Sequence, residues 1–160
     1  MHNTESPAGA SVAVTRCAVP RPALLLGGAG LIPVIGLSTW ILVLPDSNPP
    51  LTALIGYCAT ILAFLGGAEW GLAAPQGGTK GVLWRRFSLS VVPSLLGWLA
   101  LLLQSRPAIA ILLSGFVWTV VYDHRLGLVG DAPEWYPRLR WPLSLVMIAC
   151  LIAVLSILEH

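Results

Sequence analysis

The sequence predicts an all-α fold, a polytopic integral membrane protein built as a bundle of five transmembrane helices. Three observations predict it: five long apolar stretches, a composition with 56% apolar and only 10% charged residues, and a mean hydropathy of +0.82. Soluble domains carry about 25% charged residues, so this composition does not fit a soluble core. We expect one membrane domain over residues 22–160, preceded by a disordered tail over residues 1–21.

The five expected spans follow one another with short connectors between them. They cover residues 24–44, 51–74, 87–104, 108–122 and 141–158. A bilayer core about 30 Å thick needs roughly 20 apolar residues per helix, with about 17 as a minimum, so the fourth span is marginal. The first span could instead be a signal peptide, but its apolar run is too long and no Ala-x-Ala cleavage site follows it. We therefore expect it to stay as an anchor.

Positive charge is placed asymmetrically among the connectors. Of the nine Lys and Arg residues, only Arg106 falls on one of the two sides. The other side holds Arg16, Arg21, Lys80, Arg85, Arg86, Arg125, Arg138 and Arg140. Because cytoplasmic connectors carry the excess of Lys and Arg, the N-terminus is expected in the cytoplasm and the C-terminus outside. A formal net charge of +2 does not indicate a nucleic-acid partner.

Small residues recur every four positions along the second span. They are Ala59, Ala63, Gly67 and Gly71. Such a stripe lets another helix approach closely within a membrane. It predicts a helix-packing face, either between helices of one chain or at the seam of a dimer.

Two prolines lie inside expected spans. Pro33 is in the first and Pro93 in the third. Proline removes a backbone donor and clashes with the preceding turn, and membrane helices tolerate this when neighbours satisfy the freed carbonyl groups. We expect a kink at each of these two positions.

Glu69 is the only acidic residue inside an expected span, and Trp70 follows it. Ionisable groups at membrane depth are costly and mark functional sites by default, so these two residues are a candidate polar intramembrane site. In one interpretation the carboxylate pairs with an arginine of the cytoplasmic side. In the other it is a proton or cation site.

The fourth connector mixes aromatic and charged residues. The residues that we single out there are Asp123, His124, Arg125, Trp135, Tyr136, Arg138 and Arg140. Trp and Tyr suit the headgroup region, and arginines suit anionic lipid phosphates. The connector is expected to be an interfacial anchor or a docking patch for a partner.

Catalytic and metal-binding patterns are missing from the sequence. It contains no Ser/His/Asp arrangement, no His-Glu-x-x-His and no phosphate-binding loop. The three cysteines and three histidines have no metal-ligand spacing. We therefore expect no enzyme activity, no metal and no cofactor.

Several short phrases together resemble the transmembrane protein 69-like family. They are residues 28–33 (Gly-Ala-Gly-Leu-Ile-Pro), 64–75 (Phe-Leu-Gly-Gly-Ala-Glu-Trp-Gly-Leu-Ala-Ala-Pro), 91–96 (Val-Val-Pro-Ser-Leu-Leu), 135–136 (Trp-Tyr) and 139–140 (Leu-Arg). The phrase around Gly66, Gly67, Trp70 and Gly71 is the most specific. The resemblance covers residues 24–158 and implies an inner-membrane location, here the inner membrane of a bacterium, without implying an activity.

Two function classes remain open. Short loops, the small-residue stripe and the lack of catalytic groups favour a small accessory or assembly subunit of an inner-membrane complex, with the bilayer and another membrane protein as partners. Glu69, the two prolines and Trp98 and Trp118 favour a protein that binds or transports a lipophilic small molecule. Size and tryptophan content also resemble the tryptophan-rich sensory proteins in outline, but their characteristic first loop has no counterpart here.

Overall fold

The computed structural model describes residues 18–44, 48–74, 79–129 and 132–158, and this part of the chain is mostly helical and contains no strands. The helices are α1 (Arg21–Ala29), α2 (Leu31–Val43), α3 (Asn48–Ala73), α4 (Lys80–Leu101), α5 (Ser105–Val129) and α6 (Trp135–Leu158). The all-α prediction is confirmed for these residues. Residues 1–17, most of the expected N-terminal tail, lie outside them.

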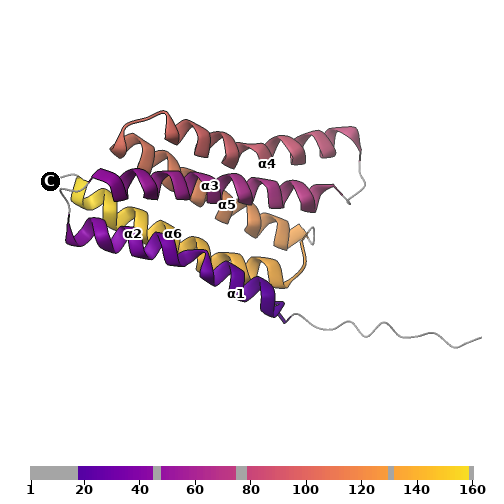
Figure 1. Cartoon of the computed structure of the whole chain (residues 1–160). Helices are drawn as coiled ribbons and strands as arrows, with labels where there is room; N and C mark the ends of the chain where they lie inside the picture. Colours follow the sequence, from indigo (N-terminus) through magenta and orange to yellow (C-terminus); the bar gives the residue numbers. More distant parts are fainter. Residues whose placement is uncertain (1–17, 45–47, 75–78, 130–131, 159–160) are drawn as a thin grey trace, which may run out of the picture.

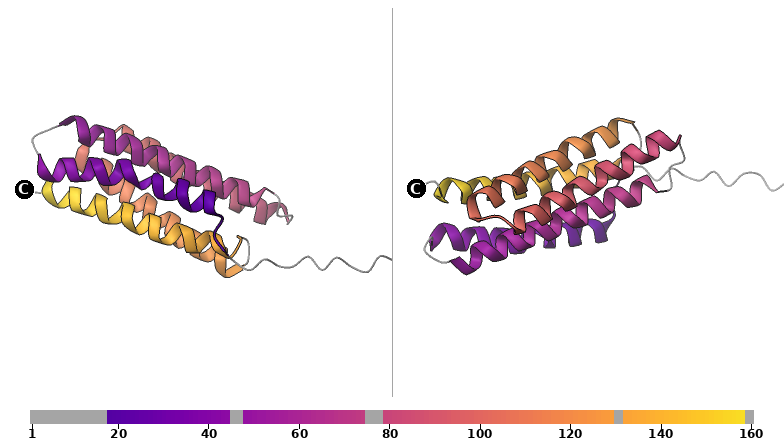
Figure 2. Two further views of the ribbon diagram at one scale, coloured as in Figure 1. Left: turned by 60° about the horizontal axis from the view of Figure 1, so that its bottom comes forward. Right: turned by 90° about the horizontal axis from the view of Figure 1, so that it is seen from above.

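The helices form a bundle of roughly parallel rods, and from α2 onward each helix runs opposite to the one before it (Figure 1). α1 and α2 continue one another and together lie beside α6, as the two further views also show (Figure 2). α3 packs against α2, α4 and α5, and α5 also packs against α4 and α6. Because α3 and α5 each contact three other rods, their inward faces are well placed to hold a shared interior site.

The first rod is interrupted at Gly30, one turn before Pro33. Pro33 has no backbone N–H, so the carbonyl group one turn earlier loses its helical donor. The Tyr57 hydroxyl of α3 donates a hydrogen bond to the Gly30 carbonyl at 2.8 Å, which satisfies a backbone acceptor at the break. A break in the helix thus lies close to Pro33, whereas α4 is continuous through the buried Pro93. The bends expected at these two prolines stay predictions.

Four helical units are long and apolar enough to cross a membrane: Arg21–Val43, Pro50–Ala73, Ser105–Val129 and Trp135–Leu158. The second, fourth and fifth predicted spans correspond to the last three of these. α4 is not in this group, because its first turns carry Lys80, Arg85 and Arg86 and it ends at Leu101. The chain is thus a multi-helix membrane protein with four candidate spans among the described residues.

α5 and α6 are both longer than predicted. The marginal fourth span, expected over residues 108–122, is a helix of 25 residues. The expected connector between the last two spans is helical except for a few residues, because α5 runs to Val129 and α6 begins at Trp135. The sequence predicts an earlier end for α5 and a later start for α6, because charged residues are typical of loops between membrane spans.

The closest helix contact joins α3 and α4 through glycines. A Cβ atom added at Gly66 would lie 2.5 Å from the Ser90 carbonyl oxygen, and one added at Gly97 would lie 2.8 Å from the Ala59 carbonyl oxygen. Only glycine fits at such distances without a backbone shift. The Ser94 hydroxyl donates to the Ala63 carbonyl at 3.4 Å across the same contact. Backbone packing therefore joins these two helices.

Within the chain, this contact uses only part of the predicted packing stripe, and the seam of a dimer stays a prediction. Ala59 is buried in it, but Ala63, Gly67 and Gly71 are exposed. A Cβ atom added at Gly67 or Gly71 would meet no atom of the described residues within 4 Å. After Ala59 the stripe faces the outside of the bundle. The residue that lies at the helix contact there is Gly66, one position before Gly67 of the stripe.

Candidate functional site

Glu69 lies inside the bundle, one turn before the end of α3. Its exposed fraction is 2%, and neither of its carboxyl oxygens has a hydrogen-bond partner among the described residues. It is close enough to Asp123 and Arg140 to interact electrostatically with both. A buried polar group without a partner is rare and calls for an explanation.

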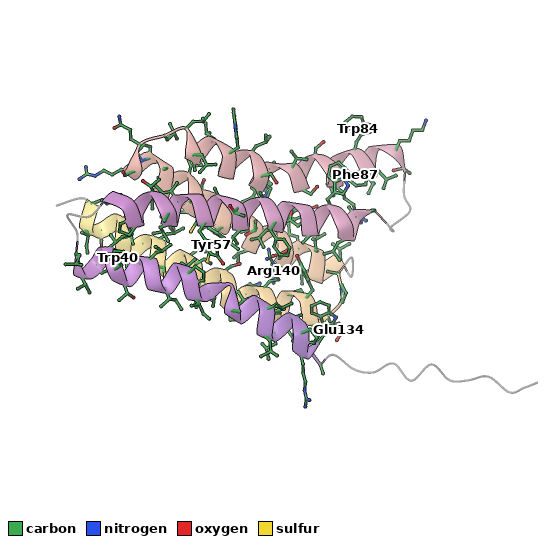
Figure 3. All side chains as sticks on the ribbon, in the orientation of Figure 1. Trp40, Tyr57, Trp84, Phe87, Glu134 and Arg140 are labelled. Carbon is green, nitrogen blue, oxygen red and sulfur yellow. The ribbon has the colours of Figure 1, made fainter. Side chains whose placement is uncertain are left out.

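Asp123 and Arg140 form a buried ion pair between α5 and α6. The Arg140 Nε atom donates to Asp123 Oδ2 at 3.1 Å. The guanidinium carbon also lies 5.6 Å from the ring centroid of Tyr136, which is one turn earlier on α6 and within the range of a cation–π contact. Figure 3 shows Arg140 within the bundle, whereas Trp84 and Glu134 lie at its periphery. These four side chains, Glu69, Asp123, Tyr136 and Arg140, are called the interior cluster below.

The hydrogen-bonding capacity of the interior cluster is incompletely used. Besides the two Glu69 oxygens, the atoms without partners are Asp123 Oδ1, the Tyr136 hydroxyl and Arg140 Nη2. With two carboxyl groups and one guanidinium group, the fully ionised cluster has one uncompensated negative charge. Such a charge is strongly unfavourable in an apolar interior. A proton or a cationic group on the Glu69 carboxyl would remove it.

The structure separates the two residues of the predicted intramembrane site. Glu69 faces the interior, but Trp70 is 46% exposed and lies on the outside of the bundle. There it packs on Phe87 of α4, with ring centroids 4.6 Å apart. These rings, together with Lys80, Leu83 and Trp84, line an outer pocket of about 360 Å³, which we call the aromatic pocket.

The predicted docking patch is wrong for three of its members. Asp123, Tyr136 and Arg140 are buried in the bundle, because each is on the inward face of a helix that the sequence analysis ended too early or began too late. The remaining members stay at the surface: His124, Arg125 and Arg138 are exposed, and Trp135 is half-buried. The anchoring or docking role stays a prediction for those four.

The periodicity of buried residues contains the signal that identifies the interior cluster. On α5 the buried positions include Leu112, Phe116, Thr119, Asp123 and Leu126. On α6 they include Tyr136, Arg140, Ser144, Met147, Leu151 and Val154. These spacings of three and four follow one helix face. Continuing the apolar stripes through the charged residues would have placed Asp123 and Arg140 inside.

The interior cluster differs from a metal centre in the groups that it contains. Within the described ranges no three His, Cys, Asp or Glu side chains are grouped so that they could hold a metal ion. Cys58 and Cys150 are free thiols. The interior cluster instead offers carboxyl acceptors beside guanidinium and phenol donors, so it can bind a proton or a small group that both donates and accepts hydrogen bonds.

Comparison with known proteins identifies relatives over most of the chain. A family model described as "Protein of unknown function (DUF3429)" matches residues 19–156. The Transmembrane protein 69 of Xenopus tropicalis is 37% identical over 139 residues, which cover 85% of this chain and 54% of the relative. The Mus musculus protein of the same name is 32% identical over 145 residues, covering 88% and 58%.

The chain spans little more than half the length of these curated relatives. No solved structure matches it.

Proposed function

Because the chain belongs to the Transmembrane protein 69-like family, described as of unknown function (DUF3429), we propose a function from its own interior site. We propose that it binds or transports a lipophilic, protonatable small molecule in the inner membrane of a bacterium, and that Glu69 receives the proton or cationic group. The proposed topology has five crossings, including α4, with the arginine-rich end of the bundle in the cytoplasm.

The single observation that carries this proposal is the buried Glu69 carboxyl group without a hydrogen-bond partner. A purely structural carboxylate would be expected to pair with Arg140, but that guanidinium group bonds Asp123 instead. The acceptor at Glu69 is therefore available for an exchangeable group.

Replacing Glu69 with glutamine tests this function. We expect the affinity for cationic or protonatable lipophilic ligands to fall about 10- to 100-fold, because a hydrogen bond to a charged group contributes about 1.5–3 kcal/mol. The measurement is quenching of tryptophan fluorescence in liposomes by lipophilic amines, quinones and porphyrins. Glu134→Gln, which changes an exposed carboxyl group at the start of α6, is the matched control. Equal quenching curves for all three proteins across these ligands would argue against the proposal.

A second candidate function is that of a small accessory or assembly subunit of a membrane complex. Gly67 and Gly71 favour it, because they face outward with open space beside them. Glycine in a helix costs about 1 kcal/mol relative to alanine, and lipid contact does not require it. A closely packed helix from another protein would use this surface.

The accessory function predicts that Gly67→Val combined with Gly71→Val abolishes co-purification of a stoichiometric partner from native membranes. The bundle itself should stay folded, since the added side chains point into open space. Gly36→Val is the control, because Gly36 is an outward-facing glycine of α2 that also has nothing within 4 Å of its added Cβ. Mass spectrometry of eluates in mild detergent gives the readout. Recovery of the same partner with both variants, or purification without any partner, would count against this function.

A further inference from the structure

A second site lies on the outside of the bundle between α4 and α5. It is a groove of about 540 Å³, within the range of small-molecule sites. Its lining residues are Arg85, Arg86, Leu89, Trp118, Val121, Tyr122, Arg125, Leu126, Leu128 and Val129. Among the described residues that line it there is no member of the interior cluster and no acidic side chain, so this groove is separate from the site proposed above.

The arginines and the deeper apolar side chains line different parts of the groove. α4 begins at one end of the bundle, and α5, which runs antiparallel to it, ends at that same end (Figure 1). On α4, Arg85 comes one turn before Leu89, and on α5, Arg125 comes one to two turns after Val121 and Trp118. Deeper along the helices than the two guanidinium groups, both walls are therefore apolar, and Leu128 and Val129 add apolar surface on the other side of Arg125, at the end of α5.

The arginines of the groove belong to the cationic end of the bundle. Among the described residues, every Lys and Arg except Arg106 lies toward that end, and Arg106 bonds the Leu158 carbonyl at the opposite end. Arg85 and Arg125 are both exposed. Guanidinium groups bind phosphate through paired charge-assisted hydrogen bonds. The two exposed arginines of the groove are thus complementary to a phosphate group.

We propose that the groove binds an anionic glycerophospholipid, with its phosphate at Arg85 and Arg125 and one acyl chain along Leu89 and Trp118. A free phosphate would contact only the two arginines and would leave the apolar walls unoccupied. An acidic peptide would likewise leave them unfilled. A lipid matches both the arginines and the apolar walls. The groove also runs along two helices of a membrane protein, where lipid is the surrounding solvent.

Lipid titrations followed by native mass spectrometry test this site. The probes are phosphatidylglycerol and phosphatidylcholine with identical acyl chains, added to the full chain in a mild detergent. We expect phosphatidylglycerol to bind about 10- to 30-fold more tightly, because each basic residue near a membrane surface attracts anionic lipid appreciably. The double variant Arg85→Gln/Arg125→Gln should lose this preference.

The matched control is Arg21→Gln/Arg138→Gln, which removes two exposed arginines of the same end that do not line the groove. Retained preference in the control supports a defined site, whereas equal loss in both double variants would show general surface attraction and overturn the proposal. Trp118→Ala should weaken the binding of phosphatidylglycerol and leave the binding of inorganic phosphate unchanged. Full displacement of the lipid by inorganic phosphate would indicate an anion site instead. Unchanged thermal unfolding midpoints establish that the variants fold.

Discussion

Replacing Asp123 with alanine is expected to lower the free energy of unfolding by about 3–5 kcal/mol, the cost of leaving one member of a buried ion pair alone. Arg140 is buried, and its Nε atom donates to Asp123 at 3.1 Å. Without that acceptor the guanidinium group would remain desolvated, with only the nearby Glu69 carboxyl to compensate its charge. Chemical denaturation in mixed micelles, followed by circular dichroism, measures the change.

The control removes both charges in Asp123→Leu/Arg140→Met. Apolar replacement of a whole buried pair is often neutral or stabilising, so this double variant should be more stable than the single one. Asp123→Ala should also lower the free energy of unfolding further in a Glu69→Gln background, because residue 69 then has no carboxylate near Arg140. A single variant as stable as the wild type, or a double variant as unstable as the single one, would show that the pair is not the origin of the effect.

The same pair shows where the sequence is informative and where it is not. Apolar runs such as residues 51–74 predict their helices well, because a continuous hydrophobic stretch has few stable alternatives in a bilayer. Asp123 and Arg140 were placed in a connector, because an isolated charge is unfavourable inside a membrane. The compensating residue is 17 positions away on another helix, and hydropathy along the chain cannot identify that partner.

Glu69 stands out in the sequence because it is a charged residue within an apolar run. Its surroundings could not be predicted in the same way. Several arginines were possible partners, and the outcome depends on the rotation of α3 about its axis, which places Glu69 inside and Trp70 outside. A shift of one residue along a helix turns a side chain by about 100°, so small errors in the assigned face exchange interior and surface.

The rotation of α3 also explains why Gly66, and not its neighbour Gly67, is expected to tolerate no larger side chain. A Cβ atom at Gly66 would lie 2.5 Å from the Ser90 carbonyl oxygen and 2.9 Å from the Ser94 hydroxyl oxygen. The first of these atoms belongs to the backbone of α4 and cannot turn away as a side chain would. Gly66→Val should therefore separate α3 from α4 and destabilise the bundle by about 1–3 kcal/mol, the usual cost of overpacking.

Gly67→Val is the matched control, because it adds the same side chain one position along the same helix, where nothing lies within 4 Å of the added Cβ. Its free energy of unfolding in mixed micelles should stay within about 0.5 kcal/mol of the wild type. Gly97→Val, on the α4 side of the contact, should behave like Gly66→Val, since its Cβ would meet the Ala59 carbonyl oxygen at 2.8 Å. Equal stability of the Gly66 and Gly67 variants would mean that α3 is rotated differently about its axis, and then Glu69 would not face the interior cluster. The glycine pair thus tests the geometry on which the proposed Glu69 site depends.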